Sequence, residues 1–202
     1  MSKRFFFILI ALMAVTAVTA VSSVTGMFMD LRDGKKYKTV KIGNQTWMAE
    51  NLNYEIADSY CYNNDTSNCK KYGRLYTRDA ALKVCPAGWH LPSKEEFDIL
   101  IKTVGGEKIA GEKLKSKSGW NDGGNGSDAF GFSALPAGVW FDGGITGDDA
   151  GFSEMTVGTG FWGSTENANK DLYEMNLVDN EIAPYFSYRG RGFGNSVRCI
   201  KD

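Results

Sequence analysis

Residues 85–97 constrain the fold of this chain more than any other segment. They read Cys-Pro-Ala-Gly-Trp-His-Leu-Pro-Ser-Lys-Glu-Glu-Phe, in which Ser93 and Glu96 form a capping box, the signature of a helix N-terminus. Large apolar residues then recur on one helical face, at Phe97, Leu100, Ile101 and Val104. The pattern predicts a helix over residues 93–104 that lies on a hydrophobic core and ends at Gly105-Gly106.

Residues 1–20 have the order of a signal peptide. Lys3-Arg4 is charged, residues 5–15 are almost purely apolar, and Val18-Thr19-Ala20 fits the small-x-small cleavage rule. We expect cleavage after Ala20 and a secreted or cell-surface protein. The alternative is a retained anchor, since the apolar run is about as long as the shortest membrane span. No later apolar run is long enough to cross a membrane, and the cleavage site has no cysteine for lipid attachment.

Four cysteines follow, and because we expect the chain to be exported, we also expect disulfides. Of the three pairings that four cysteines allow, we expect Cys61–Cys69 as a local link and Cys85–Cys199 as the bridge that closes the fold end to end. Spacing alone does not prove this choice.

The composition excludes one class of partner. Loss of Lys3 and Arg4 with the signal peptide leaves 21 basic and 24 acidic residues, a net charge of −3 instead of −1. No basic patch with interleaved aromatics is visible, which argues against a nucleic-acid partner. We divide the rest into a lead-in over residues 21–32, with loose structure over residues 27–36, and a single domain over residues 33–202.

Alternation and turn residues predict the other elements. We expect one hairpin from residues 37–42 and 45–49, joined at Gly43-Asn44, and a second from residues 172–177 and 181–188, joined at Asp179-Asn180. Thr77 is the expected N-cap of a short helix over residues 77–84. Residues 161–165 and 196–200 are expected strands. Residues 51–72 and those after Gly106 are expected to lack further helices.

Several motifs resemble one bacterial family. They are Asp33-Gly34-Lys35, Gln45-x-Trp47-Met48-Ala49-Glu50-Asn51-Leu52, Tyr72-Gly73-Arg74-Leu75-Tyr76, the segment of residues 85–93, Gly131-Phe132-Ser133-x-Leu135-Pro136 and Ser196-Val197-Arg198-Cys199. Together they resemble the Fibrobacter succinogenes major paralogous domain, and the element order resembles the C-type lectin-like fold. The resemblance implies an α+β domain in which two short helices pack on twisted antiparallel hairpins, closed by disulfides. It implies no activity for any residue, and Gly163 departs from the Trp-Ser-Ser that is more usual there.

Catalytic residues are sparse. His90 is the single histidine, and it lies between Trp89 and Leu91, where a structural hydrogen-bonding role is expected. No nucleophile with a paired base is visible. Formylglycine-generating enzymes, which share the lectin-like fold, use two close cysteines late in the chain, whereas Cys199 is alone here. An enzyme of that kind is therefore our third choice.

Loop oxygens leave calcium open as a cofactor. Asp122, Asn125 and Asp128 lie in a Gly-rich loop, but no glutamate closes a twelve-residue calcium pattern, and a plain polar turn is the alternative. Asp142, Asp148 and Asp149 form a second acidic loop with the same two interpretations.

Aromatic and arginine side chains beside Gly-rich loops are the candidate ligand contacts, because rings can stack on sugars while polar groups bond the hydroxyls. They are Trp120, Trp140, Phe141, Arg189, Arg191 and Phe193, whereas Trp47, Trp89 and Trp162 are expected in the core. We therefore expect an exported, non-enzymatic binding domain for extracellular carbohydrate or a surface protein. A structural or adhesive surface module without a small ligand is the alternative.

Overall fold

The computed structural model describes residues 24–143 and 150–202. The expected signal peptide, residues 1–20, lies outside the described residues, as do Asp148 and Asp149 of the second acidic loop.

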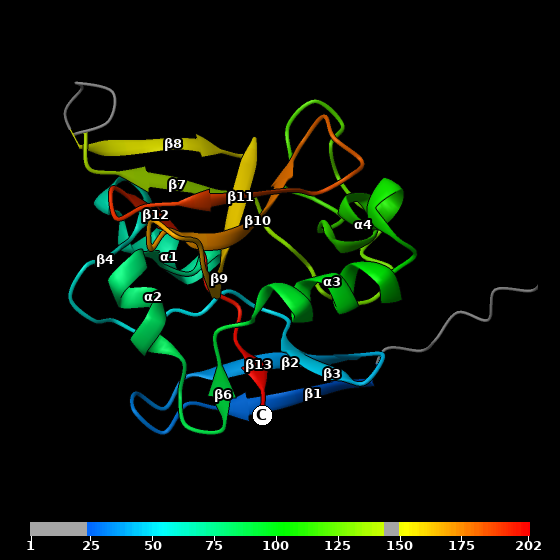
Figure 1. Cartoon of the computed structure of the whole chain (residues 1–202), viewed down its shortest axis with the longest axis horizontal. Coiled ribbons are helices and arrows are strands. Elements are labelled where there is room, and N and C mark those ends of the chain that lie inside the picture. The colour runs from blue at the N-terminus through cyan, green and yellow to red at the C-terminus, as the bar shows by residue number, and fades with distance from the viewer. Residues whose placement is uncertain (1–23, 144–149) are drawn as a thin grey trace, which may run out of the picture.

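Two sheets form the framework, one at each end of the view in Figure 1. The first has the order β1-β2-β3-β13-β6, and the second has the order β11-β10-β9-β7-β12-β5-β4 with β8 paired to β7. Strands β7 and β9 pair in parallel. The bounds are β1 Val24–Met29, β2 Lys36–Ile42, β3 Gln45–Met48, β4 Ser59–Tyr60, β5 Leu75–Thr77, β6 Trp89–His90, β7 Ala137–Phe141, β8 Gly151–Met155, β9 Gly158–Glu166, β10 Leu172–Val178, β11 Tyr185–Arg189, β12 Phe193–Asn195 and β13 Ile200–Lys201.

Both predicted helices are present. In α3, Lys94–Thr103, the Ser93 hydroxyl accepts from the Glu96 amide while the Glu96 carboxylate accepts from the Ser93 amide, which completes the capping box. In α2, Arg78–Val84, the Thr77 hydroxyl accepts from the amide of Ala80 at 3.4 Å. These helices follow from local signals within a few residues of their first turn.

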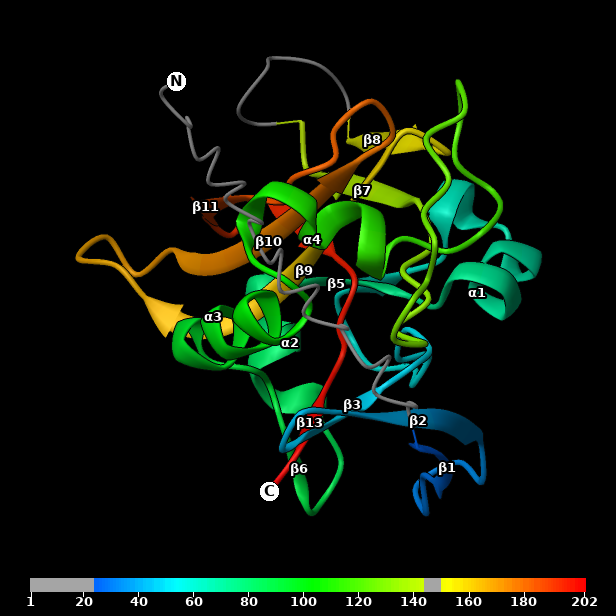
Figure 2. The same cartoon turned by 90° about the vertical axis from the view of Figure 1, so that its right-hand side faces the viewer.

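The expected count of two helices is wrong, because the described part of the chain also contains α1, Thr66–Tyr72, and α4, Glu107–Leu114. Asp65 caps α1, and a short 3-10 turn, Tyr62–Asn64, precedes it. Helix α4 begins after Gly106 without a side-chain cap. Helices this short are marginal alone and depend on tertiary packing, so the sequence showed little of their periodicity. Figure 2 shows α1 well separated from α2 and α3.

Both predicted hairpins are confirmed. Strands β2 and β3 pair up to Ile42 opposite Gln45, and β10 and β11 pair from Leu172 opposite Arg189 to Asn176 opposite Tyr185. The return strand of the second hairpin begins at Tyr185, later than the expected start at residue 181. The expected closing strand is shorter than predicted, because residues 196–199 run between β12 and β13 from one sheet to the other.

The expectation of a loose lead-in over residues 27–36 is corrected by β1. This strand pairs with β2 from Val24 opposite Lys41 to Met29 opposite Lys36. It forms the edge of its sheet and leaves Met27 63% exposed, while Phe28 packs on Trp89 with ring centroids 5.0 Å apart. An edge strand buries little surface, so it lacks the alternation by which a strand is recognised.

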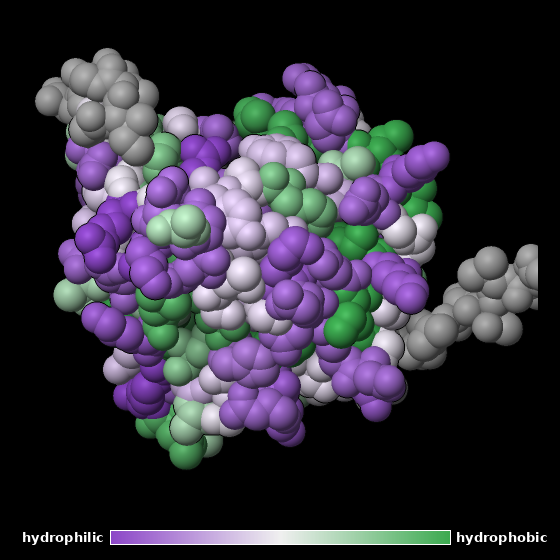
Figure 3. Space-filling view, in the orientation of Figure 1, coloured by the Kyte–Doolittle hydropathy of each residue, from purple (hydrophilic) through white to green (hydrophobic). Residues whose placement is uncertain are grey.

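The surface in the orientation of Figure 1 carries polar residues over most of its area, with apolar residues in separate groups among them (Figure 3). Within residues 24–143 and 150–202, no helix is long and apolar enough to cross a membrane.

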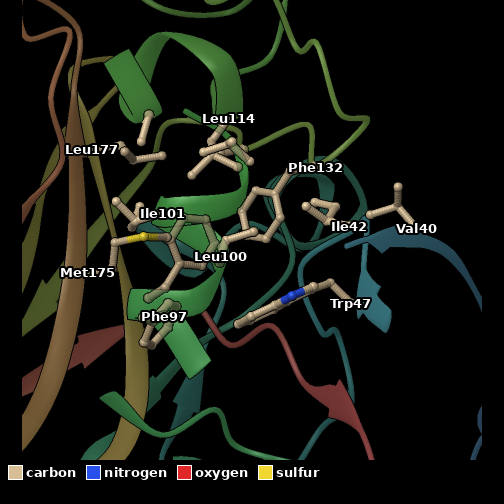
Figure 4. Packing of buried hydrophobic residues seen from close by; sticks show 14 of the residues in the cluster. Val40, Ile42, Trp47, Phe97, Leu100, Ile101, Leu114, Phe132, Met175 and Leu177 are labelled. Carbon is tan, nitrogen blue, oxygen red and sulfur yellow. The ribbon is translucent and has the colours of Figure 1, made fainter. Parts of the chain in front are cut away.

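The main core lies between helices α3 and α4 and the two sheets (Figure 4). Phe97 and Leu100 of α3 are fully buried, as are Trp47 of β3 and Met175 of β10. The ring centroids of Trp47 and Phe97 are 5.6 Å apart. Burial of each such large side chain stabilises the fold by about 1.5 to 3 kcal/mol. The apolar face predicted on α3 therefore helps to hold this helix against residues of both sheets.

Both predicted disulfides are confirmed. Cys61 and Cys69 have Cα atoms 4.9 Å apart, and Cys85 and Cys199 have Cα atoms 5.9 Å apart. The second bridge ties the end of α2 to the C-terminal segment, as expected.

Candidate functional site

The aromatic candidates do not share one exposed face. Trp120 is 5% exposed and belongs to the main core, so the prediction of an exposed ring is wrong. Its indole Nε1 donates to the Ser116 hydroxyl and to the Ala134 carbonyl, both at 3.1 Å. The Gly-rich loop turns this ring inward, because its polar atom finds two acceptors there and its apolar face leaves water.

Trp140 is half-buried and stacks on Tyr60, with ring centroids 4.3 Å apart. Phe141 lies opposite Phe193 in the pairing of β7 with β12. These three candidates therefore come together on one sheet. Trp47, Trp89 and Trp162 are buried, as predicted.

The two arginine candidates are both engaged. Nε of Arg189 donates to the buried Glu174 carboxylate at 2.7 Å, and its guanidinium lies 4.4 Å from the centroid of the Phe193 ring. Burial lowers the pKa of Arg189, but the Glu174 carboxylate raises it by more than burial lowers it. The net pKa of Arg189 is therefore above its ordinary value. Nε of Arg191 lies 3.2 Å from Asp79. Both arginines therefore form ion pairs with carboxylates of the protein itself.

The calcium candidates act as turn residues. Asp128 accepts from the amide of Ser133 at 2.7 Å and from its hydroxyl at 2.5 Å, and Asn125 accepts from the amide of Trp120 at 3.1 Å. Asp122 is exposed. In the described part of the chain, no group of three or more His, Cys, Asp and Glu is placed to hold a metal ion.

His90 joins the C-terminus to α3. Its Nδ1 lies 2.6 Å from the Asp202 carboxylate and its Nε2 lies 2.9 Å from the Glu96 carboxylate. This arrangement is the hydrogen-bonding role expected from the sequence.

A pocket of about 510 Å³ opens at a different place, beside β1, β2 and α1. Its lining also includes residues 49–51 and Asn53, three residues of the loop before β7, and Arg198. The three loop residues are Gly131, Ser133 and Leu135. Figure 2 shows α1, β2 and the loop before β7 on the same side of the molecule. The pocket is therefore built by tertiary structure from segments that are distant in sequence.

Arg198 is a fully buried part of this lining. Its guanidinium donates to Asn51 Oδ1 at 2.7 Å, to the carbonyls of Met48 and Ser133 at 3.3 and 2.9 Å, and to the carbonyl of Phe132. No carboxylate of the described residues lies within ion-pairing distance of Arg198. Burial lowers the pKa of Arg198 to about 9, so the group still carries its charge at neutral pH.

Asn51 sets the position of Arg198 relative to α1. Its Nδ2 donates to the carbonyl of Tyr72 at 2.8 Å and to the hydroxyl of Ser196 at 3.1 Å, while its Oδ1 receives the bond from Arg198. Gly73 ends α1 with φ +78°, and a Cβ atom there would lie 2.6 Å from Cβ of Asn51. The close approach requires glycine and holds α1 against the pocket wall.

Lysines line the same pocket as this buried cation. The cationic side chains of the lining are Lys35, Lys36, Lys38, Lys70, Lys71 and Arg198, and Glu50 is its one carboxylate among the described residues. Glu50 accepts from the amide of Lys38 at 2.8 Å and lies 3.7 Å from its ammonium group. The pocket is thus basic in a protein whose net charge is −1.

No sequence pattern marked these residues as a site. Lys35, Asn51 and Arg198 stood inside recognised motifs, but Lys70 and Lys71 lay in a stretch that was read as irregular. A lysine pair in a polar segment has the appearance of a solvated surface. Only the fold brings the two lysine groups to one opening.

Fold and pocket together define a disulfide-closed α+β domain with a cationic pocket between its edge hairpin and a short helix. The chain belongs to the Fibrobacter succinogenes major domain family, whose model matches residues 40–201. This match confirms the family suggested by the sequence motifs. No curated protein and no solved structure matches the chain.

Proposed function

We propose that this chain is an exported, non-enzymatic domain that binds an extracellular carbohydrate. The observation that carries the proposal is the pocket of about 510 Å³, which is large enough for one or two sugar rings and is lined by side chains that carry amides, hydroxyls and positive charges. The resemblance to the C-type lectin-like fold, in which loops often bind sugars, is part of this proposal.

Two features of the structure support binding over catalysis by a cysteine or a histidine. All four cysteines are in disulfides, so no thiolate remains for a formylglycine-type reaction. His90, the sole histidine, is held between two carboxylates away from the pocket lining. The pocket groups are suited to hydrogen bonds with hydroxyl groups.

The proposal is tested with the protein of residues 21–202 and a panel of soluble plant and bacterial polysaccharides. Thr25 lines the pocket mouth, and Thr25→Trp should fill it and abolish binding without changing the melting temperature. Met29→Trp is the matched control, because Met29 is exposed on the same strand and outside the lining. Absence of binding to every polysaccharide, or equal binding by both variants, would overturn the proposal.

An adhesive surface module is the second candidate function. It is favoured by the apolar side chains that strand β1 and the turn after it expose, with Met27 63%, Met29 47% and Leu31 85% exposed. An edge strand of this kind can add a strand from a partner protein. Concentration-dependent association in analytical ultracentrifugation, lost in Met27→Lys with Leu31→Lys, would support this function instead.

A further inference from the structure

We infer that the pocket beside β2 and α1 is an anion site, and that its ligand is a polysaccharide whose sugar rings carry carboxylates. The part of this inference that concerns sugars rests on the proposed function. The part that concerns charge rests on the lining itself.

The first observation is the number of cations. Six cationic side chains line the pocket, namely Lys35, Lys36, Lys38, Lys70, Lys71 and Arg198, against Glu50 as the one described carboxylate. The chain as a whole has one more acidic than basic residue. Cations gathered in a concave site raise the local concentration of anions and speed their association.

The second observation is that most of these lysines are not neutralised. Lys35 pairs with Asp33 at 2.9 Å, and Lys38 lies near Glu50. Lys36, Lys70 and Lys71 have no ion pair with any carboxylate of the described residues, and the Lys71 ammonium lies 4.6 Å from the centroid of the Tyr72 ring. Three exposed lysines of the lining are therefore without an acidic partner among the described residues.

The third observation is the buried guanidinium of Arg198. Its four hydrogen bonds go to an amide oxygen and to three backbone carbonyls, all of them neutral. An arginine has five N–H groups, so one remains without an acceptor in the described part of the protein. Asp128 and Glu50 raise the pKa of Arg198 electrostatically, but neither forms an ion pair with it. A buried charge normally has a paired counter-charge, and an anion in the pocket would supply one.

The remaining lining groups favour a sugar acid over a nucleic acid. Asn53, Thr25 and Ser133 can bond hydroxyl groups at the pocket wall. Tyr37 is the one aromatic residue of the described lining, and it is 4% exposed, with its hydroxyl accepting from the amide of Asn53. Single-stranded nucleic acids require open aromatic faces on which bases stack, and this lining offers none.

The test compares two forms of one polymer, polygalacturonate and its fully methyl-esterified form, by isothermal titration calorimetry. They differ only in the negative charge on each ring. We expect the ester to bind at least about tenfold more weakly than the acid. We also expect the affinity for the acid to fall as NaCl rises from roughly 50 to 500 mM, because salt screens ion pairs at the exposed mouth of the pocket.

Charge reversal locates the site. Lys70→Glu with Lys71→Glu should weaken binding of polygalacturonate at least tenfold. Lys83→Glu with Lys102→Glu is the matched control, because these lysines also lie in the last turns of helices, are exposed and are outside the lining. The control has the same net charge and should bind within about twofold of the wild type, as expected for distant charges in salt.

Each outcome decides between the two proposals. Equal binding of acid and ester, or equal binding by the two charge-reversal variants, would overturn the anion inference and leave the carbohydrate function standing. Failure of both polymers would remove the carbohydrate function for this ligand class. The anion site would then be judged with sodium sulfate: a melting temperature raised in the wild type and control but not in the Lys70→Glu, Lys71→Glu variant supports it, and equal effects overturn it.

Discussion

Nε of Arg198 donates a hydrogen bond of 2.7 Å to Oδ1 of Asn51, which is 147 positions earlier in the sequence. Both residues are buried, and Asn51 in turn bonds the carbonyl of Tyr72 at the end of α1. One amide side chain therefore connects the first hairpin, helix α1 and the C-terminal segment. This connection fixes the wall of the basic pocket.

Asn51→Leu should destabilise the protein by about 2 to 4 kcal/mol, because it leaves a buried guanidinium N–H and a buried carbonyl without partners. Urea unfolding followed by tryptophan fluorescence measures this loss. Asn169→Leu is the control, since Asn169 is exposed in the turn between β9 and β10, where its backbone amide donates to Oδ1 of Asn167. Equal stability of Asn51→Leu and the wild type would contradict the role of this connection.

Trp120→Ala and Trp140→Ala should differ in stability. Trp120 is in the core and bonds two acceptors, so its loss should cost about 3 to 5 kcal/mol. Trp140 is half-buried, and losing its stacking on Tyr60 should cost about 1 to 2 kcal/mol. Thermal and urea denaturation of the two variants compare them. A larger loss of stability for Trp140→Ala than for Trp120→Ala would contradict the prediction that Trp120 makes the more important core contacts.

The long disulfide should contribute more stability than the short one. Cys85 and Cys199 are 114 positions apart, whereas Cys61 and Cys69 are 8 apart. In the chain-entropy model, closing the long loop contributes about 4 to 5 kcal/mol and closing the short one somewhat less than about 3. Unfolding of the two double Cys→Ser variants gives both values. The reverse order would show that strain or residual structure outweighs loop entropy here.

His90 should make stability depend on pH near neutrality. Burial lowers the pKa of His90, but its hydrogen bonds to Asp202 and Glu96 together raise the pKa by more than burial lowers it. The net pKa lies above the ordinary 6.5. The protonated ring therefore stabilises the folded state fully below about pH 6.5, and this contribution is lost as pH rises through the folded-state pKa. The side chain is 42% exposed, so solvent screening should keep the effect below about 1 kcal/mol.

The measurement is the melting temperature between pH 5.5 and 8.5, together with the NMR titration of this single histidine. His90→Gln should show a flatter profile than the wild type. Asp202→Asn should lower the histidine pKa towards 6.5. A wild-type pKa below 6.5 would contradict the expected sign.

Asp128→Ala should lower stability by about 1 to 2 kcal/mol through loss of the bonds to Ser133. Because both carboxylate oxygens serve the turn, the loss should be the same in calcium and in EDTA. Differential scanning calorimetry under both conditions checks this. A wild-type melting temperature that falls in EDTA, with the response removed by Asp122→Ala, would instead establish a calcium site in this loop.

Local patterns predicted a substantial part of the fold. The capping box at Ser93 and Glu96 predicted α3, and alternation around Gly43-Asn44 predicted the first hairpin, because these signals act between residues a few positions apart. The expected disulfide pairs were one choice among three that four cysteines allow, and the structure confirmed that choice. The family followed from the motifs of residues 85–93 and 196–199, which the family match covers.

The amino-acid sequence alone was enough to predict these local elements and the family, and it narrowed the cysteine pairing to three possibilities. Tertiary structure decided the rest: that Trp120 turns inward, that α1 forms, and that Lys70 and Lys71 meet Lys36 and Arg198 at one pocket. Which side chains are buried, and which charged groups lie close together, depends on contacts between segments distant in sequence, such as that of Asn51 with Arg198. No pattern within a short window carries that information.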